Sequence, residues 1–144
     1  MRLSSIYLRV KGRARITMSK RETPLTRRFW QQTGGTLIEE FLAVPLGADH
    51  GKRLIDGVII LGGPHEIQSW QGADLKGKDI IVIQTKASRL GMYILGQGIL
   101  SARLMQRFEP ASIRSVVICN KGDSILEPIA KDFGIDVVIY PEYQ

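Results

Sequence analysis

Five apolar segments of strand length, and the stretches between them, leave few ways for this chain to fold. Three of them, TLIEEFLAV, RLIDGVII and DIIVIQTK, follow one another without a helical pattern between them. The other two, residues 112–120 and 135–141, are each preceded by apolar residues at helical spacing. Short connections favour antiparallel neighbours, and helical crossovers favour parallel ones. We therefore expect one mixed sheet, antiparallel in its first part and parallel in its last.

Three segments are predicted to be helical. In TPLTRRFWQQ, Thr23 can cap the helix and Pro24 can take its first position. Residues 91–108 and 122–133 carry apolar residues at helical spacing. The predicted order is helix, three strands, helix, strand, helix, strand. That order is typical of an α/β protein with three layers, α/β/α, around a mixed central sheet.

The composition indicates one globular domain. A chain of 144 residues with 44% hydrophobic and 24% charged residues is long enough for a single core. No apolar run approaches the ~20 residues of a membrane helix, and the first residues lack the pattern of a secretory signal. We therefore expect a cytoplasmic protein that does not enter a membrane.

Basic residues are concentrated at the beginning of the chain. Residues 1–28 hold nine lysines and arginines against one acid, Glu22, whereas the rest holds eleven basic and thirteen acidic residues. We expect residues 1–22 to be a basic extension and residues 23–144 to be the domain. Met18 also offers a second start, which would make residues 1–17 an upstream extension. Such a segment can contact a phosphate backbone, and a solvated leader is the alternative.

Polar residues inside apolar strands point to a site. Asp56 lies within RLIDGVII, and Gln84 and Lys86 end DIIVIQTK. Because a strand alternates its side chains, Gln84 and Lys86 share one face. If these two strands pair, the three side chains converge at one end of the sheet. Acids in apolar strands are costly unless they are paired or bound to metal, and this applies also to Glu39 or Glu40 in TLIEEFLAV.

The chemistry of these groups suits a hard cation. Carboxylate and amide oxygens bind Mg²⁺, which takes one or two carboxylates together with water and substrate phosphate. A lysine beside such an ion can neutralise charge that develops on phosphorus. The pattern therefore predicts a site for Mg²⁺ or Mn²⁺ that acts on a phosphate ester.

The same pattern resembles the PD-(D/E)xK nuclease superfamily. The likeness rests on Asp56 in one strand, a polar-x-Lys at the end of the next strand, and Gly96-Gln97 in the following helix. It covers residues 24–140 and implies the restriction-endonuclease-like fold. It also implies a metal-dependent endonuclease that hydrolyses phosphodiester bonds of DNA, with RNA left open, and a homodimer.

The resemblance assigns roles residue by residue. Asp56 would be the metal-binding aspartate, Gln84 would stand in place of the second carboxylate, and Lys86 would be the catalytic lysine. Glu39 or Glu40 would supply the additional glutamate that many members carry, with Glu40 the expected metal ligand. Gln97 would match the glutamine often found on the following helix.

The chain departs from the superfamily at Gln84, where most members carry Glu or Asp. A neutral amide removes one negative charge from the metal site, although some branches of the superfamily have glutamine there. Two functions therefore stay open: an active nuclease, and a catalytically inactive module that binds DNA or regulates a partner. An unrelated ligand-binding α/β protein is a third hypothesis, which a doubly wound parallel sheet would favour.

Overall fold

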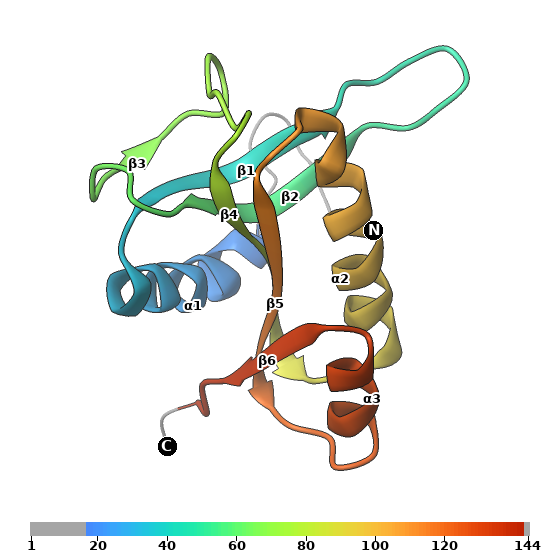
Figure 1. Ribbon diagram of the computed structural model, residues 1–144. Coiled ribbons are helices and arrows are strands. Elements are labelled where there is room, and N and C mark those ends of the chain that lie inside the picture. The colour runs from blue at the N-terminus through green and yellow to red at the C-terminus, as the bar shows by residue number, and fades with distance from the viewer. Residues whose placement is uncertain (1–16, 143–144) are drawn as a thin grey trace.

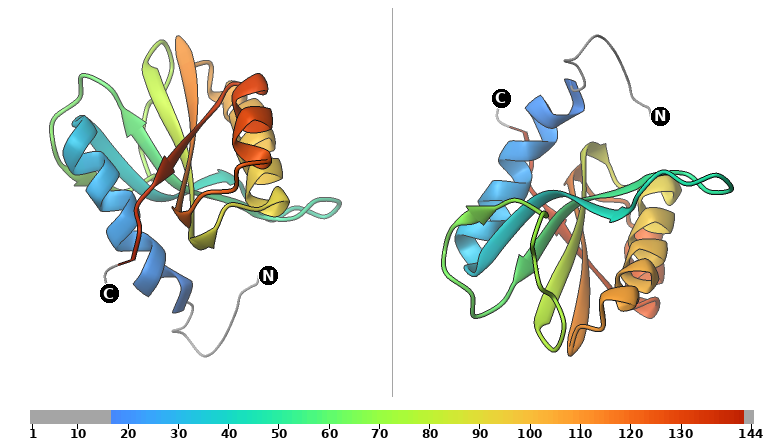
Figure 2. Two further views of the ribbon diagram at one scale, coloured as in Figure 1. Left: turned by 90° about the horizontal axis from the view of Figure 1, so that it is seen from below. Right: turned by 90° about the horizontal axis from the view of Figure 1, so that it is seen from above.

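A computed structural model describes residues 17–142. A six-stranded mixed sheet forms its centre. One helix covers one face of the sheet and two helices cover the other, so the protein has three layers (Figures 1 and 2). The mixed α/β class expected from the sequence is confirmed.

The elements follow one another in the expected order, with two short additions, β3 and η1. They are α1 (Thr17–Thr33), β1 (Thr36–Val44), β2 (Arg53–Ile60), β3 (Ile67–Gln68), β4 (Asp79–Arg89), α2 (Met92–Met105), η1 (Gln106–Phe108), β5 (Ser112–Lys121), α3 (Leu126–Asp132) and β6 (Ile135–Ile139).

The sheet has the strand order β3-β1-β2-β4-β5-β6. β1, β2 and β4 form an antiparallel meander, whereas β4, β5 and β6 run parallel. Helix α2 makes the crossover from β4 to β5, and α3 makes the crossover from β5 to β6. The change from antiparallel to parallel pairing therefore comes at β4, as the connections predict. A doubly wound parallel sheet is excluded for the described residues.

Apolar side chains fill both interfaces between the sheet and its helices. On the α1 face, Phe29 and Trp30 pack on β1, β4 and β5. On the opposite face, Met105 of α2 packs on β1, β2 and β4. Close to it, α2 and α3 share a third cluster over β5 and β6. β4 and β5 are buried on both sides, which explains their continuous apolar sequences.

Helix α1 begins earlier than the sequence predicted. It starts at Thr17, and Pro24 lies inside it rather than at its first position. The prediction was wrong because the helix continues through Pro24, which leaves the carbonyl of Lys20 without its intrahelical partner, and both residues are exposed so that water can bind this carbonyl. The helix consequently crosses the boundary expected between residues 22 and 23. Residues 1–16 of the predicted extension lie outside the described part of the chain.

Within residues 17–142, we find no helix that combines the length and the apolar character needed to cross a bilayer.

Candidate functional site

Strands β2 and β4 separate at Asp56. Their pairing runs from Ile60 opposite Ile80 to Gly57 opposite Ile83 and ends there. Beyond this point the amide of Thr85 on β4 has a side chain of β2 as its hydrogen-bond acceptor. Oδ2 of Asp56 accepts this hydrogen bond at 2.8 Å. Asp56 therefore lies against the end of β4 that carries the predicted site.

Helix α1 supplies the next contacts along the same end of β4. Oε2 of Glu22 accepts a hydrogen bond from the amide of Ala87 at 2.9 Å, and Nη2 of Arg21 donates to the carbonyl of Ala87 at 3.0 Å. Amides two residues apart on a strand point the same way and lie about 7 Å apart. The carboxylates of Asp56 and Glu22 thus occupy neighbouring places on one edge of β4.

Burial disfavours the charged form of the Glu22 carboxylate. Its Oε1 atom is buried and has no hydrogen-bond partner among the described residues. Burial raises the pKa of the Glu22 carboxyl above its ordinary value, and the hydrogen bond from Ala87 and the charges of Arg21 and Lys86 oppose this rise without cancelling it. A carboxylate with a desolvated, unpartnered oxygen is suited to accept a cation.

Two further contacts fix α1 against the strands beside these carboxylates. The hydroxyl groups of Thr26 and Thr85 are buried and lie 2.8 Å apart. On β2, a Cβ at Gly57 would lie 3.1 Å from the side chain of Thr26, so the glycine allows the helix to approach closely. Thr26 lies one turn after Glu22, which places both side chains on the face of α1 that meets β4.

The side chain of Gln84 is buried on the α2 face of the sheet, opposite to the side chain of its neighbour Thr85. Its Nε2 donates a hydrogen bond to the hydroxyl of Ser101 on α2 at 2.6 Å. Since that contact occupies the nitrogen, Oε1 is the Gln84 atom that can bind a cation. The assignment of Gln84 as a metal ligand stays a prediction.

Lys86 is exposed at the same end of β4, close enough to Glu22 for its charge to lower the pKa of that carboxyl. Arg89, three residues later, is also exposed and donates from Nη1 to the carbonyl of Gly122 at 2.7 Å. Both cations therefore lie on β4 within two residues of Ala87, whose amide Glu22 binds. A site of this composition suits an anion such as a phosphate group.

The structure separates the two glutamates that the sequence left open. Glu39 forms a bidentate ion pair with Arg27 of α1, with N–O distances of 2.8 and 2.9 Å. Glu40 is exposed and has a left-handed backbone, with φ of 48°. Since Glu39 pairs with Gly57 and Phe41 with Ile55, the register places Glu40 level with Asp56. Glu40 therefore stays a prediction, whereas Glu39 is committed to Arg27.

Gln97 is exposed on the flank of α2. The inner face of that helix carries Ile94, Gly98 and Ser101, and Ser101 is the α2 side chain that contacts Gln84. The role that the resemblance gives to Gln97 stays a prediction.

Glu22 is the residue that the sequence reasoning missed. It is the only acid among residues 1–28, and the spacing of Glu22, Thr26, Phe29 and Trp30 places it on the apolar side of a helix. The predicted helix begins at Thr23, one residue after Glu22, so the prediction did not place Glu22 on a helix face.

Residues 17–142 contain no group of three or more histidine, cysteine, aspartate or glutamate side chains arranged to hold a metal ion. A metal at this site would therefore depend on two carboxylates, completed by water, an amide oxygen or substrate. Comparisons of the chain with protein-family models, curated proteins and solved structures find no match.

Proposed function

We propose that this protein is a small metal-dependent endonuclease of the PD-(D/E)xK type that hydrolyses phosphodiester bonds in DNA. The observation that carries the proposal is that Asp56 and Glu22 accept hydrogen bonds from the amides of Thr85 and Ala87, two residues apart on β4. In addition, Oε1 of Glu22 is buried without a hydrogen-bond partner among the described residues. The antiparallel meander that becomes parallel at β4 supports the restriction-endonuclease-like fold, to which we assign the chain.

The residues present fit a divalent ion. Asp56 would hold Mg²⁺ or Mn²⁺ at the edge of β4, with Glu22 from the α1 face, Oε1 of Gln84 from the α2 face and Glu40 as further ligands. The ion would act as a Lewis acid on the scissile phosphate and lower the pKa of water. Oε1 of Glu22, which is buried and has no hydrogen-bond partner within residues 17–142, is the atom that a cation would bind.

The protein side chains perform the remaining tasks. Lys86 would bind a non-bridging oxygen of the scissile phosphate and stabilise the charge that grows on it. Arg89 and Arg21 would bind neighbouring phosphates, which favours a polyanionic substrate over a small ester. The excess of basic residues in the first 28 positions supports a nucleic acid in the same way.

The proposal is tested with labelled single-stranded, double-stranded and branched DNA in Mg²⁺ or Mn²⁺. Asp56→Asn keeps an acceptor for the Thr85 amide while removing the charge, and Lys86→Ala removes the ammonium. Both should reduce cleavage by at least about 100-fold. Asp49→Asn in the loop between β1 and β2, and Lys76→Ala before the opposite end of β4, are controls of equal chemistry that should cleave normally.

Calorimetry with Mn²⁺ gives a readout that does not depend on turnover. Binding to the unsubstituted protein and its loss in Asp56→Asn would support the site. Cleavage that survives in both Asp56→Asn and Lys86→Ala would place the activity elsewhere and overturn the proposal.

A catalytically inactive module that binds DNA or a regulatory partner is the second candidate. It is favoured by Gln84, a neutral residue anchored on Ser101, and by the lack of a three-residue metal group in the described chain. DNA binding without cleavage or Mn²⁺ binding would support this second function.

A further inference from the structure

Helix α2 is apolar on both of its faces. Its inner face packs on the sheet, and its outer face exposes Met92, Tyr93 and Leu100, which are 70% to 78% accessible. No charged residue occurs between Arg89 and Arg103. A helix that is apolar all round is normally buried on all sides. Within residues 17–142, nothing covers the outer face of α2.

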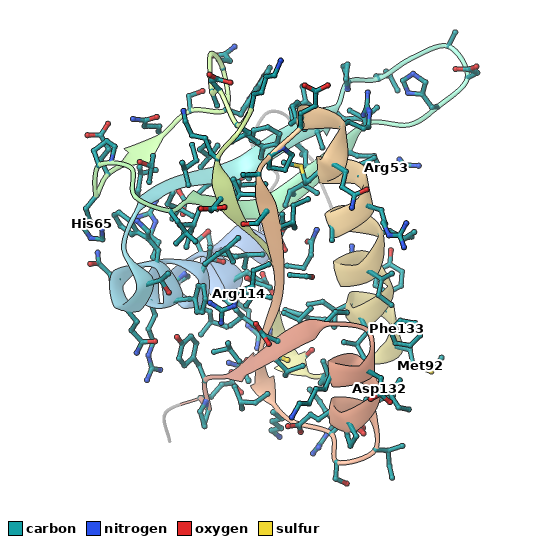
Figure 3. All side chains as sticks on the ribbon, in the orientation of Figure 1. Arg53, His65, Met92, Arg114, Asp132 and Phe133 are labelled. Carbon is teal, nitrogen blue, oxygen red and sulfur yellow. The ribbon has the colours of Figure 1, made fainter. Side chains whose placement is uncertain are left out.

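Helix α3 and its flanks extend this apolar surface. Ile125, Ile129 and Phe133 are 44% to 72% exposed. The two helices lie on the same side of the sheet and share a buried cluster (Figure 2). Figure 3 shows Met92 and Phe133 in the region where the beginning of α2 meets α3. We call the six side chains Met92, Tyr93, Leu100, Ile125, Ile129 and Phe133 the α2–α3 patch.

The size of the patch is that of an interface. Covering six large apolar side chains that are each about two-thirds exposed removes roughly 600 Å² of apolar surface from water. Each partner of a standard interface buries about 800 Å². The largest apolar patch of a typical soluble monomer is about 300–600 Å² and often marks an interaction site, so this patch lies at the upper end of that range.

A glycine at the middle of the outer face indicates close helix packing. Gly98 has a reason within the chain, because a Cβ there would lie 3.0 Å from Val117. Gly96 has none, since a Cβ there would meet nothing within 4 Å. A glycine inside a helix is destabilising relative to alanine, so the isolated chain gains nothing from it. A second helix that crosses at Gly96 would use the missing side chain.

We propose that the α2–α3 patch is the interface of a homodimer in which the two α2 helices pack antiparallel across Gly96. A two-fold interface brings each surface against itself, so it needs a patch without repulsive charge, and this patch has none. The antiparallel arrangement would also place Arg103 of one copy at the beginning of the other copy's α2. There Leu90 and Ile94 share a buried cluster with Ala130 of α3, and the exposed Asp132, labelled in Figure 3, follows two residues later. The proposal does not depend on the nuclease function.

Sedimentation of the full chain at micromolar concentrations tests the dimer. Leu100→Glu would bury a charge at the interface, and Gly96→Lys would obstruct the helix crossing, so each should raise the dimer Kd by at least about tenfold. Leu46→Glu is the matched control, because Leu46 is 76% exposed in the loop between β1 and β2 and lies outside the patch. It should leave the Kd unchanged. Circular dichroism melts identify any variant that fails to fold.

Gly96→Lys separates this proposal from a general loss of stability. In the isolated chain the new side chain enters open space and improves helix propensity, so the diluted monomer should melt no lower than the unsubstituted monomer. A chain that is monomeric at tens of micromolar would overturn the proposal, as would a dimer whose Kd neither substitution changes. Mixing Arg103→Asp with Asp132→Arg should restore dimers that each variant alone forms weakly. Failure of that rescue would overturn the antiparallel orientation.

Discussion

Oε2 of Glu22 accepts a hydrogen bond from the backbone amide of Ala87 at 2.9 Å, while Oε1 of the same carboxylate is buried without a partner in the described chain. The first contact holds α1 against β4 beyond the point where the pairing between β2 and β4 ends. One carboxylate thus combines a structural contact with a group poised for a ligand.

Glu22→Gln should therefore stabilise the metal-free protein at neutral pH. The amide keeps an acceptor for Ala87 and removes a desolvated charge, so we expect a gain of up to about 1 kcal/mol in the free energy of unfolding. Because the folded pKa is raised, the protonated carboxyl contributes stability below the ordinary pKa of 4.5. That contribution is lost as the pH rises through the folded value.

Urea unfolding of both proteins from pH 4 to pH 8 measures this difference. The advantage of Glu22→Gln should be smallest at the acid end and grow as the pH rises. A variant that is less stable at every pH would show that the Glu22 charge is a net structural contact and would remove it as a site residue.

The turn between α1 and β1 offers a matched pair of substitutions. Gly34 and Gly35 both have positive φ, 87° and 82°. A Cβ at Gly35 would lie 2.5 Å from the carbonyl oxygen of Ile60, whereas a Cβ at Gly34 meets nothing within 4 Å. Gly34→Ala should cost about 1 kcal/mol of unfolding free energy from backbone strain alone. Gly35→Ala should cost at least about 3 kcal/mol because a clash is added. Equal losses in urea unfolding would contradict this reading of the turn.

The sequence predicted the layers and the pairing directions because both depend on connections and on long apolar runs. It placed Asp56 and the end of β4 near each other for the same reason: successive antiparallel strands must pair. The Asp56 bond to Thr85 bears out that proximity.

The sequence could not decide between Glu39 and Glu40, because strict alternation of side chains breaks at that point. Ile38 and Phe41 belong to the same buried cluster although they are three residues apart, and Glu40 between them has a positive φ. The partner strand shows the same break, since Ile55 and Val58 also share that cluster. A period of two cannot reveal a single residue whose backbone reverses the faces.

Cys119 should be inert in the folded protein. It lies fully buried on β5, and burial raises the pKa of its thiol to about 11. At pH 8 about one thiol in a thousand is then ionised, and the thiolate is the reactive form. Titration with a coloured disulfide reagent should show slow reaction in buffer and fast reaction in urea, with Cys119→Ser as the blank. Fast reaction in buffer would show that β5 opens readily.

Gln84→Glu tests whether the neutral residue at the end of β4 is what weakens metal binding. Without metal, a carboxylate at this buried position should lower the free energy of unfolding by about 1 to 3 kcal/mol, because only the Ser101 hydroxyl is known to meet it. With Mn²⁺ at 100 times its Kd, binding to the folded state returns about 2.7 kcal/mol. The variant should therefore melt below the unsubstituted protein in chelator and regain most of the difference in Mn²⁺.

Gln106→Glu makes the same chemical change at an exposed position after α2 and should show neither effect. A melting temperature of Gln84→Glu that Mn²⁺ leaves unchanged would mean that this side chain does not face the ion and that Gln84 serves only to anchor α2 on the sheet.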